Sequence, residues 1–274
     1  MITINENDMS SLNFLAPIIT DDLIRVGNQN DGGYVVPRRA VRSSTALVSF
    51  GVSTDWSFEQ HFMQINPDVE IHAYDHTVSE RLFKHNFHKG LVKFLLGALA
   101  FDALRNQFEL WRSFRAFFGQ HATHFRQRIY DAHLQPLDAT LEEVFARTRS
   151  GKIFLKIDIE GGEYRIIGDI LRNADRIEAL VIEFHDTKPL REVFCGAVRR
   201  LQERFDVVHL HGNNCGPLAP DGFPDFVEIT FAKRRDAVAR SRRSSLPIEG
   251  LDAPNDAGRE DYRLLFSPED ADAA

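Results

Sequence analysis

The sequence has little cysteine, no long apolar run and no excess of positive charge, and each of these absences excludes a class of protein. Its 2 Cys are too few for a disulfide framework and suit a reducing compartment. No apolar run approaches the roughly 20 residues that a membrane-spanning helix needs. Residues 1–11 are polar and acidic, unlike a signal peptide, so we expect a cytoplasmic protein. The formal net charge of −7 argues against nucleic acid as the main partner.

Tyrosine and tryptophan are also scarce, whereas phenylalanine is abundant. The chain has 22 Phe against 5 Tyr and 2 Trp. With 43% hydrophobic and 27% charged residues, the composition is otherwise that of an ordinary globular protein, which excludes global disorder. A length of 274 residues allows one large domain or two small ones.

Between residues 45 and 233, strand-like apolar runs alternate with helical patterns. This alternation predicts a mostly parallel sheet with helices on both faces. A loop rich in Gly, Pro and Asn joins the last two runs, which predicts an antiparallel hairpin at one edge of the sheet. We therefore predict a Rossmann-like, doubly wound α/β domain, with strands at residues 45–50, 69–74, 152–157, 177–184, 205–211 and 226–232.

Two regions flank this predicted core of residues 45–235. The leader, residues 1–44, contains an Asn-Asp-Gly-Gly-Tyr turn at 30–34. The tail, residues 236–274, begins in a basic stretch and continues into an acidic one. We expect both charged stretches to be solvated surface and the tail to be loosely packed, with residues 262–266 as its anchor.

A Phe-rich insert, residues 79–130, interrupts the alternation. Phe87, Phe94, Phe101 and Phe108 are spaced seven apart, and residues 84–128 contain eight Lys/Arg against two Asp/Glu. The pattern favours a long amphipathic helix packed on the sheet. The alternative is a helical lid or dimer helix beside the active cleft. Its basic face would then favour a negatively charged acceptor, through Lys89, Lys93 and Arg112.

Ligands of open α/β sheets bind beyond the carboxyl ends of the strands, near the point where strand order reverses. Gly51 follows the first predicted strand, and Asp75 ends the second, 24 residues later. An acid at about this distance from a glycine turn can accept hydrogen bonds from a ribose diol. The pair is compatible with nucleoside binding, although single glycines also end strands without a ligand. The rest of a G-x-G-x-x-G motif is missing, which disfavours an NAD-dependent dehydrogenase or epimerase.

The later strand ends are rich in titratable groups. Asp158 and Glu160 follow one strand, and Glu183 and His185 lie at the end of the next. Such groups can act as a general base, or can hold Mg²⁺ or Mn²⁺ with Asp158, Glu183 and His185 as ligands. The alternative is structural, with Asp158 and Glu160 capping the following helix. His209 and His211 end a third strand on one face, where structural histidines are more common than metal ligands.

These residues resemble a known family. Residues 154–163, Phe-Leu-Lys-Ile-Asp-Ile-Glu-Gly-Gly-Glu, resemble the "LKIDVEGAE" signature of FkbM-type S-adenosylmethionine-dependent methyltransferases. Further segments resemble one branch of this group over nearly the whole chain: 30–36, 49–52 with Phe58-Glu59, Leu137-Asp138, 211–214 and 251–255.

The resemblance implies a class I methyltransferase fold with a seven-stranded sheet, S-adenosylmethionine as donor, and O-methylation of a sugar, glycan or other small hydroxyl-bearing acceptor. A homo-oligomer is compatible with it. The insert departs from the family pattern and leaves the acceptor class open, and a non-catalytic binding domain of the same fold remains the competing interpretation. Carried over by residue, the resemblance assigns the donor to Asp31, Gly32, Gly33, Phe50, Gly51, Val52, Ser53, Glu59, Asp75 and His76, and catalysis to Asp158, Glu160, Glu183 and His185.

Overall fold

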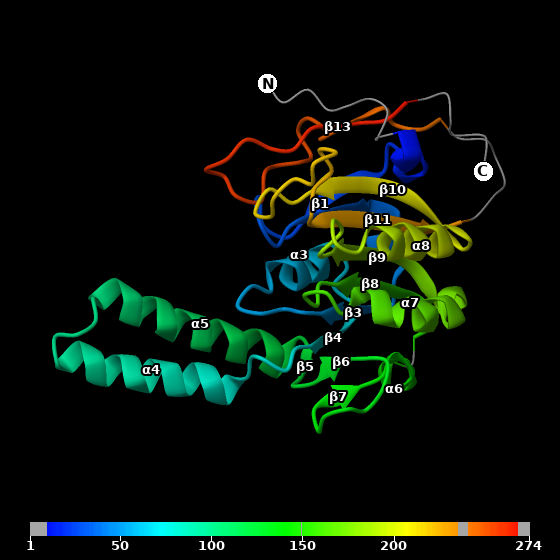
Figure 1. The fold of residues 1–274 in the computed structure, drawn as a ribbon. Helices are drawn as coiled ribbons and strands as arrows, with labels where there is room; N and C mark the ends of the chain where they lie inside the picture. The colour runs from blue at the N-terminus through cyan, green and yellow to red at the C-terminus, as the bar shows by residue number, and fades with distance from the viewer. Residues whose placement is uncertain (1–9, 149, 235–240, 268–274) are drawn as a thin grey trace.

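A computed structural model describes residues 10–148, 150–234 and 241–267. Its centre is a seven-stranded sheet in the order β10-β11-β9-β8-β3-β4-β5 (Figure 1). Strand β11 runs antiparallel to β9 and β10, and the other neighbours pair in parallel. This confirms the predicted fold class, and the strands are β3 (Ala46–Phe50), β4 (Glu70–Tyr74), β5 (Thr123–Phe125), β8 (Ile153–Ile157), β9 (Ile177–Phe184), β10 (Phe205–Gly212) and β11 (Val227–Lys233).

Both faces of the sheet are covered because successive strand residues point to opposite sides. Val48 and Leu155 belong to one core, which contains residues of α6 (Leu141–Arg147), α7 (Glu163–Arg172) and α8 (Arg191–Gln202). Leu47 and Phe154 belong to the other, which contains residues of α2 (Arg38–Ser43) and α3 (Ser57–Ile65). Strands buried on both faces read as continuous apolar runs, which is why the sequence predicted most of them. Smaller elements are η1 (Ser10–Leu15), η2 (Ala174–Arg176) and the parallel pair β6 (Arg128–Ile129) and β7 (Asp138–Ala139).

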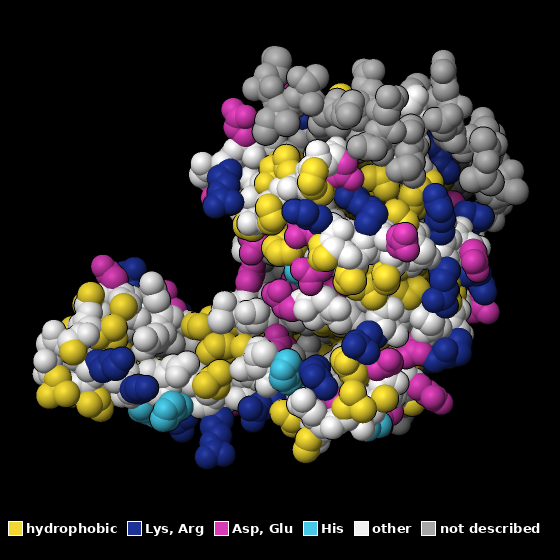
Figure 2. Space-filling view, viewed as in Figure 1, with side chains coloured by type: hydrophobic (Ala, Val, Ile, Leu, Met, Phe, Trp, Pro, Cys, Tyr) yellow, Lys and Arg dark blue, Asp and Glu magenta, His cyan; other side chains and the backbone are white. Residues whose placement is uncertain are grey.

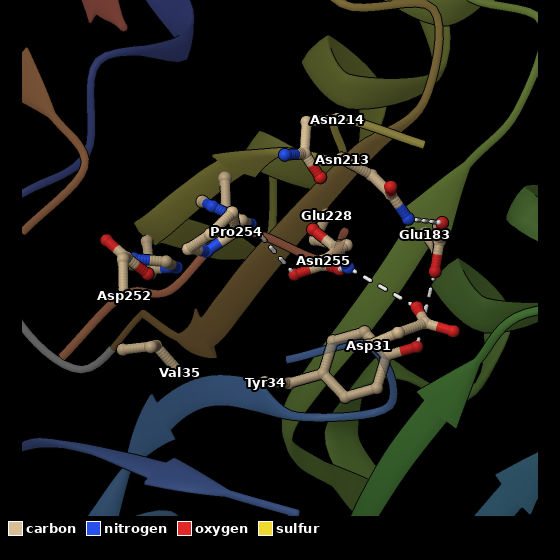
Figure 3. Close-up of polar contacts among 12 residues, drawn as sticks. Asp31, Tyr34, Val35, Glu183, Asn213, Asn214, Glu228, Asp252, Pro254 and Asn255 are labelled. Carbon is tan, nitrogen blue, oxygen red and sulfur yellow. Dashed lines mark hydrogen bonds and ion pairs between the residues drawn. The ribbon is translucent and has the colours of Figure 1, made fainter. Parts of the chain in front are cut away.

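The leader packs on this domain. Strands β1 (Leu23–Val26) and β2 (Tyr34–Pro37) form an antiparallel hairpin. The hydroxyl of Thr230 on β11 donates a hydrogen bond to the carbonyl of Val35 at 2.7 Å. Figure 3 shows Asp31, in the turn that precedes β2, and Tyr34, the first residue of β2, beside Glu183 at the end of β9. Residues 1–9 of the predicted leader lie outside the described residues.

The insert forms a projecting helical arm, so the expected single long helix on the sheet is wrong. Helix α4 (Glu80–Leu95) and helix α5 (Phe101–Gln120) form a hairpin that extends away from the body (Figure 1). The chain reverses between them, where Gly97 has a φ of +73°. The base packs on the body, with the Trp56 ring 5.5 Å from Phe114, and aromatic pairs such as Phe87–Phe108 and Phe94–Phe101 join the two helices along the arm. The chain rejoins the sheet as β5, so the helical part ends before residue 130. We call residues 80–120 the arm.

The tail is better packed than expected. Strands β12 (Ser245–Leu246) and β13 (Leu264–Leu265) pair with each other, and Leu264 and Phe266 are buried. The predicted anchor at 262–266 is therefore confirmed, whereas the expectation of a loosely packed tail is wrong for residues 241–267. Residues 235–240 and 268–274, which carry parts of the two charged stretches, lie outside the described residues. None of the described helices combines the length and apolarity needed to cross a bilayer.

Candidate active site

The strand order reverses at β3, which lies between β4 and β8, and the turn that follows β3 nearly touches the end of β8. Gly51 has a φ of +75°, and an ideal Cβ on it would lie 1.7 Å from the carbonyl oxygen of Asp158. No other residue fits there without moving the backbone. The Nζ of Lys156 donates a hydrogen bond to the Gly51 carbonyl at 3.0 Å. This edge of the sheet is the position where ligands of such folds bind.

Asp75 connects the turn after β3 to the end of β4. Its buried carboxylate accepts hydrogen bonds from the backbone N–H of Ser53 at 2.8 Å and of Thr77 at 2.7 Å. The structure therefore brings together Gly51, Ser53 and Asp75, as the donor assignment requires. His76 follows as an exposed residue whose carbonyl accepts a hydrogen bond from Arg126.

The Asp-Gly-Gly turn of the leader also reaches this loop. Asn28 donates a hydrogen bond to Asp55 at 2.7 Å, and an ideal Cβ on Gly32 would lie 2.3 Å from the Asp55 carboxylate. Residues 31–33 thus lie beside the turn that follows β3, although they are distant from it in sequence.

Three of the predicted donor residues do not present their side chains at this edge. Phe50 and Val52 are buried in the two cores. Glu59 is fully buried and accepts a hydrogen bond from the hydroxyl of Ser49, and burial raises the pKa of this carboxyl. Phe50 and Val52 can reach a ligand only through their backbone, and the Glu59 carboxylate is bonded inside the domain, so the donor contact of these three residues stays a prediction.

Asp158, Glu160, Glu183 and His185 meet beside Gly51, and we call them the acid cluster. The hydroxyl of Tyr34 lies 3.3 Å from both the Asp158 and the Glu183 carboxylates. The side-chain amide of Asn213 donates a second hydrogen bond to Glu183 at 2.8 Å. Asp158 is partly open to solvent and Glu160 is exposed, whereas Glu183 is buried. The predicted convergence of two strand ends is therefore present.

His185 is held by a buried carboxylate on one side and faces the acid cluster on the other. Its Nδ1 lies 3.1 Å from Glu163, and its Nε2 lies 3.6 Å from Glu160 and 3.9 Å from both Asp158 and Glu183. Burial favours the neutral ring, but the hydrogen bond to Glu163 and the charge of Glu183 outweigh it and raise the pKa of His185 to about 9. At neutral pH the ring is therefore an imidazolium.

Burial has the opposite consequence for the two central acids. It raises the pKa of Glu183 well above its ordinary value, and the charges of Asp158 and Glu228 raise it further. Burial also raises the pKa of Asp158, and the nearby Lys156 and His185 offset this only in part. A carboxylate with a raised pKa is a better proton acceptor, because its conjugate acid is closer in pKa to a reacting hydroxyl. The cluster can therefore serve as a general base.

Four residues of this wall were not assigned by sequence: Tyr34, Asn213, Glu228 and Asn255. Figure 3 shows Tyr34 and Asn213 directed at Glu183. Asn255 donates hydrogen bonds to Glu228 at 2.7 Å and to Asp31 at 3.4 Å. Glu228 had one usable signal in the sequence, because it is an acid inside a strand whose residues are mostly apolar.

Residues 251–262 of the tail, which we call the strap, cover this wall. Asp252 accepts a hydrogen bond from His209 at 3.1 Å, and Asp261 lies 3.1 Å from His211. The backbone N–H of Asp256 donates to Asn214 at 2.7 Å. The segment 211–214, which resembles a late family motif, therefore contacts the strap through His211 and Asn214. The histidines have carboxylate partners, as the structural interpretation of them predicted.

One group of described residues has the spacing of metal ligands. Ligand atoms of Asp158, Glu160 and His185 all lie within 4.8 Å of one another. Glu183, which was predicted in this set, is hydrogen-bonded by Asn213 and Tyr34. The structure thus places Glu160 where the sequence prediction had Glu183.

A cavity of about 370 Å³ opens between the arm and the loops that follow β3 and β4. Thr54 and Val78 line it from the loops, and Phe83, Lys89 and Gln107 line it from the arm. It adjoins the predicted donor loop and has room for part of a small acceptor.

Residues 115–208 match the family model described as Methyltransferase FkbM domain. This segment, about a third of the chain, contains the 154–163 signature together with Glu183 and His185. The match confirms the predicted resemblance and supports an S-adenosylmethionine-dependent methyltransferase. A search of curated proteins gave no match.

Solved methyltransferase structures share a weak likeness with the chain. One is fibrillarin from Aeropyrum pernix with natively bound S-adenosyl-L-methionine, at 13% identity and a TM-score of 0.36, over 80% of this chain and 86% of that one. A second is precorrin-6y C5,15-methyltransferase from Geobacter metallireducens, at 13% identity and a TM-score of 0.36, over 72% of this chain and 86% of that one. A third is a predicted O-methyltransferase from Agrobacterium tumefaciens, at 12% identity and a TM-score of 0.35, over 81% of this chain and 79% of that one. The fold assignment itself rests on the strand order.

Proposed function

We propose that this FkbM-type methyltransferase transfers a methyl group to a hydroxyl of a sugar, a glycan or another small acceptor. The observation that carries the proposal is the pairing of Asp158 and Glu183, two carboxyls of raised pKa, beside the glycine turn that follows β3. A hydroxyl needs such a proton acceptor. The free cysteines, Cys195 and Cys215, suit a reducing compartment, and we propose the cytoplasm as the setting.

The donor supplies a methyl group on a sulfonium, so the acceptor oxygen bonds the methyl carbon as the carbon–sulfur bond breaks and its electron pair stays on sulfur. The chain then has to align the acceptor and take its proton. Asp158 is the proposed proton acceptor because it is the cluster acid nearest the Gly51 turn and is partly open to solvent. Tyr34 and Asn213 hold Glu183 behind it.

The charge of the site favours a cationic donor and a neutral acceptor. The carboxylates of the acid cluster attract a sulfonium and repel an anionic group at the reacting atom. Lys89 and Lys93 of the arm line the cavity beside the loops after β3 and β4, and no member of the acid cluster is among the residues that line it. We therefore propose an uncharged hydroxyl region as the reacting part of the acceptor.

The residues present also fit a divalent cation. Glu163 fixes the His185 ring through Nδ1 and leaves Nε2 facing Asp158 and Glu160, which is the arrangement that ligating histidines adopt in metal sites. Mg²⁺ or Mn²⁺ held there would lower the pKa of a bound hydroxyl. Binding would require His185 to lose its proton, so we expect metal affinity to rise with pH.

The test measures transfer of a labelled methyl group from S-adenosylmethionine to a panel of neutral sugars and glycans, together with donor affinity by calorimetry. Asp158→Asn should lower turnover about 100-fold or more and leave donor affinity within about threefold. Asp175→Asn is the matched control, because this exposed acid precedes β9 at the opposite edge of the sheet.

Near-normal turnover of Asp158→Asn would remove the assignment of the base. Binding of NAD in place of S-adenosylmethionine would overturn the proposed reaction. Donor binding without transfer to any acceptor would instead identify a binding domain. Activity that survives chelation and is not raised by Mg²⁺ or Mn²⁺ would refute the proposed role of a cation.

A further inference from the structure

The exposed apolar side chains of this chain are concentrated on the arm. Among the described residues, thirteen large hydrophobic side chains are exposed, and eight of them lie within residues 80–120. The most exposed are in the tip, which we define as residues 91–101: Leu96 at 78%, Leu95 at 74%, Phe101 at 62% and Val92 at 56%. Isolated exposed hydrophobics are ordinary, but a contiguous group marks an interaction surface.

The arm carries a net positive charge, and the tip itself contains no acidic residue, although the exposed Asp102 directly follows it. Residues 91–101 contain no Asp or Glu and one Lys, and residues 80–120 contain seven Lys/Arg against three Asp/Glu. Figure 2 shows hydrophobic side chains gathered at the free end of the arm, with Lys and Arg beside them. An apolar end with a basic collar is the pattern of segments that enter the interface of an anionic bilayer.

We propose that the tip of the arm inserts into the interfacial region of an anionic lipid bilayer, with Lys89 and Lys93, which also line the cavity between the arm and the loops, against the lipid phosphates. Inserted this way, Leu95 and Leu96 leave water without needing a shaped pocket, which suits a convex end that projects from the body (Figure 1). Contact between the arms of two copies is less suited to these observations, because it would bring two segments of net positive charge together.

The arm transmits this docking to the rest of the protein through its base. The Trp56 ring packs 5.5 Å from Phe114, 5.7 Å from Phe118 and 6.2 Å from Phe83. Trp56 immediately precedes α3 and lies close after the Gly51 turn in the chain. The arm is therefore attached beside the donor loop, and a docked tip would fix the orientation of the acid cluster relative to the lipid surface.

The test is co-sedimentation of the full chain with two kinds of vesicle, phosphatidylcholine alone and phosphatidylcholine containing about one third phosphatidylserine. Binding should be tighter to the anionic vesicles and should fall as salt is raised. Leu95→Glu combined with Leu96→Glu should weaken it at least tenfold. Lys89→Gln and Lys93→Gln should each weaken it about fivefold, the effect expected for one basic residue at an anionic surface.

Leu134→Glu is the matched control, because Leu134 is 68% exposed but lies outside the arm, and it should bind as the unchanged protein does. Thermal unfolding of each variant checks that the fold is kept. The proposal is overturned if the unchanged protein binds neither vesicle, or if the Leu95/Leu96 variant binds as well as Leu134→Glu. It is also overturned if sedimentation velocity shows a dimer that the Leu95/Leu96 variant dissociates and no vesicle binding occurs, since the tip would then be a protein interface.

Discussion

His211 should make the stability of this protein strongly dependent on pH. The ring is almost fully buried, with Nε2 3.1 Å from Asp261 of the strap and Nδ1 3.4 Å from Glu228. Burial alone would lower the pKa, but the contacts with these two carboxylates outweigh burial and raise the pKa of His211 to about 10. The folded state therefore binds a proton on this ring that the unfolded chain releases near pH 6.5.

The magnitude follows from linkage. One pKa unit corresponds to about 1.36 kcal/mol, so a change from the ordinary value near 6.5 to about 10 couples about 4 kcal/mol to folding at pH 7. This contribution is fully present below pH 6.5 and is lost as the pH rises towards 10. Replacing the ring by a neutral side chain, His211→Gln, should lower the free energy of unfolding by about 4 kcal/mol at pH 7.

The assay is urea unfolding at a series of pH values from 6 to 10. The difference between His211→Gln and the unchanged protein should be largest at pH 6–7 and should shrink towards pH 10. His85→Gln, which replaces an exposed histidine on the arm, is the control and should leave the curve unchanged. A difference that stays constant across this range would refute the reasoning, because it would reflect packing and not the proton.

Three further predictions concern the site. Gly51→Ala should lower the free energy of unfolding by at least about 2 kcal/mol more than Gly250→Ala. Both glycines have positive φ, but only at Gly51 would the added Cβ meet backbone, namely the Asp158 carbonyl. Thermal unfolding of the two variants measures the difference. Glu183→Gln should raise stability by roughly 1 kcal/mol at pH 8, because it removes a charge that burial and neighbouring acids penalise, while turnover falls; a less stable variant would contradict this. Asp75→Asn should weaken donor affinity about tenfold or more by calorimetry, since it removes the carboxylate that binds the donor turn, and unchanged affinity would remove Asp75 from the donor site.

The sequence predicted the sheet because its central strands are apolar on both faces and end in turn or charged residues. It missed β5 because Thr123–Phe125 has only three residues and an exposed or half-buried pattern. The sequence predicted one helix for the arm because the seven-residue interval between Phe residues is kept from Phe94 to Phe101, across residues 96–100. The chain nevertheless reverses there, at a glycine of positive φ.

The acid cluster could be predicted because its members follow adjacent strands, and the ends of parallel strands converge. The residues that bond to these acids could not be predicted from the sequence. Tyr34 of the leader bonds Glu183, and Asn255 of the strap bonds Glu228 of an antiparallel strand. No local sequence pattern predicts either contact. Glu59 belongs to a segment that resembles the donor-binding turn, and the sequence did not show that its carboxylate is buried and accepts a hydrogen bond from Ser49.

The strap has a consequence for how the protein is made. The wall beside Glu183 is formed by residues from Asp31 to Asn255, and Asp261 is paired with His211. A chain emerging from the ribosome can therefore form the whole sheet, through β11, before Asn255 is available to bind Glu228. In the full chain the Asn255 amide binds Glu228, whose charge raises the pKa of the buried Glu183. Completion of the wall is thus a late event in synthesis, because Asn255 and Asp261 follow every strand of the central sheet in the chain.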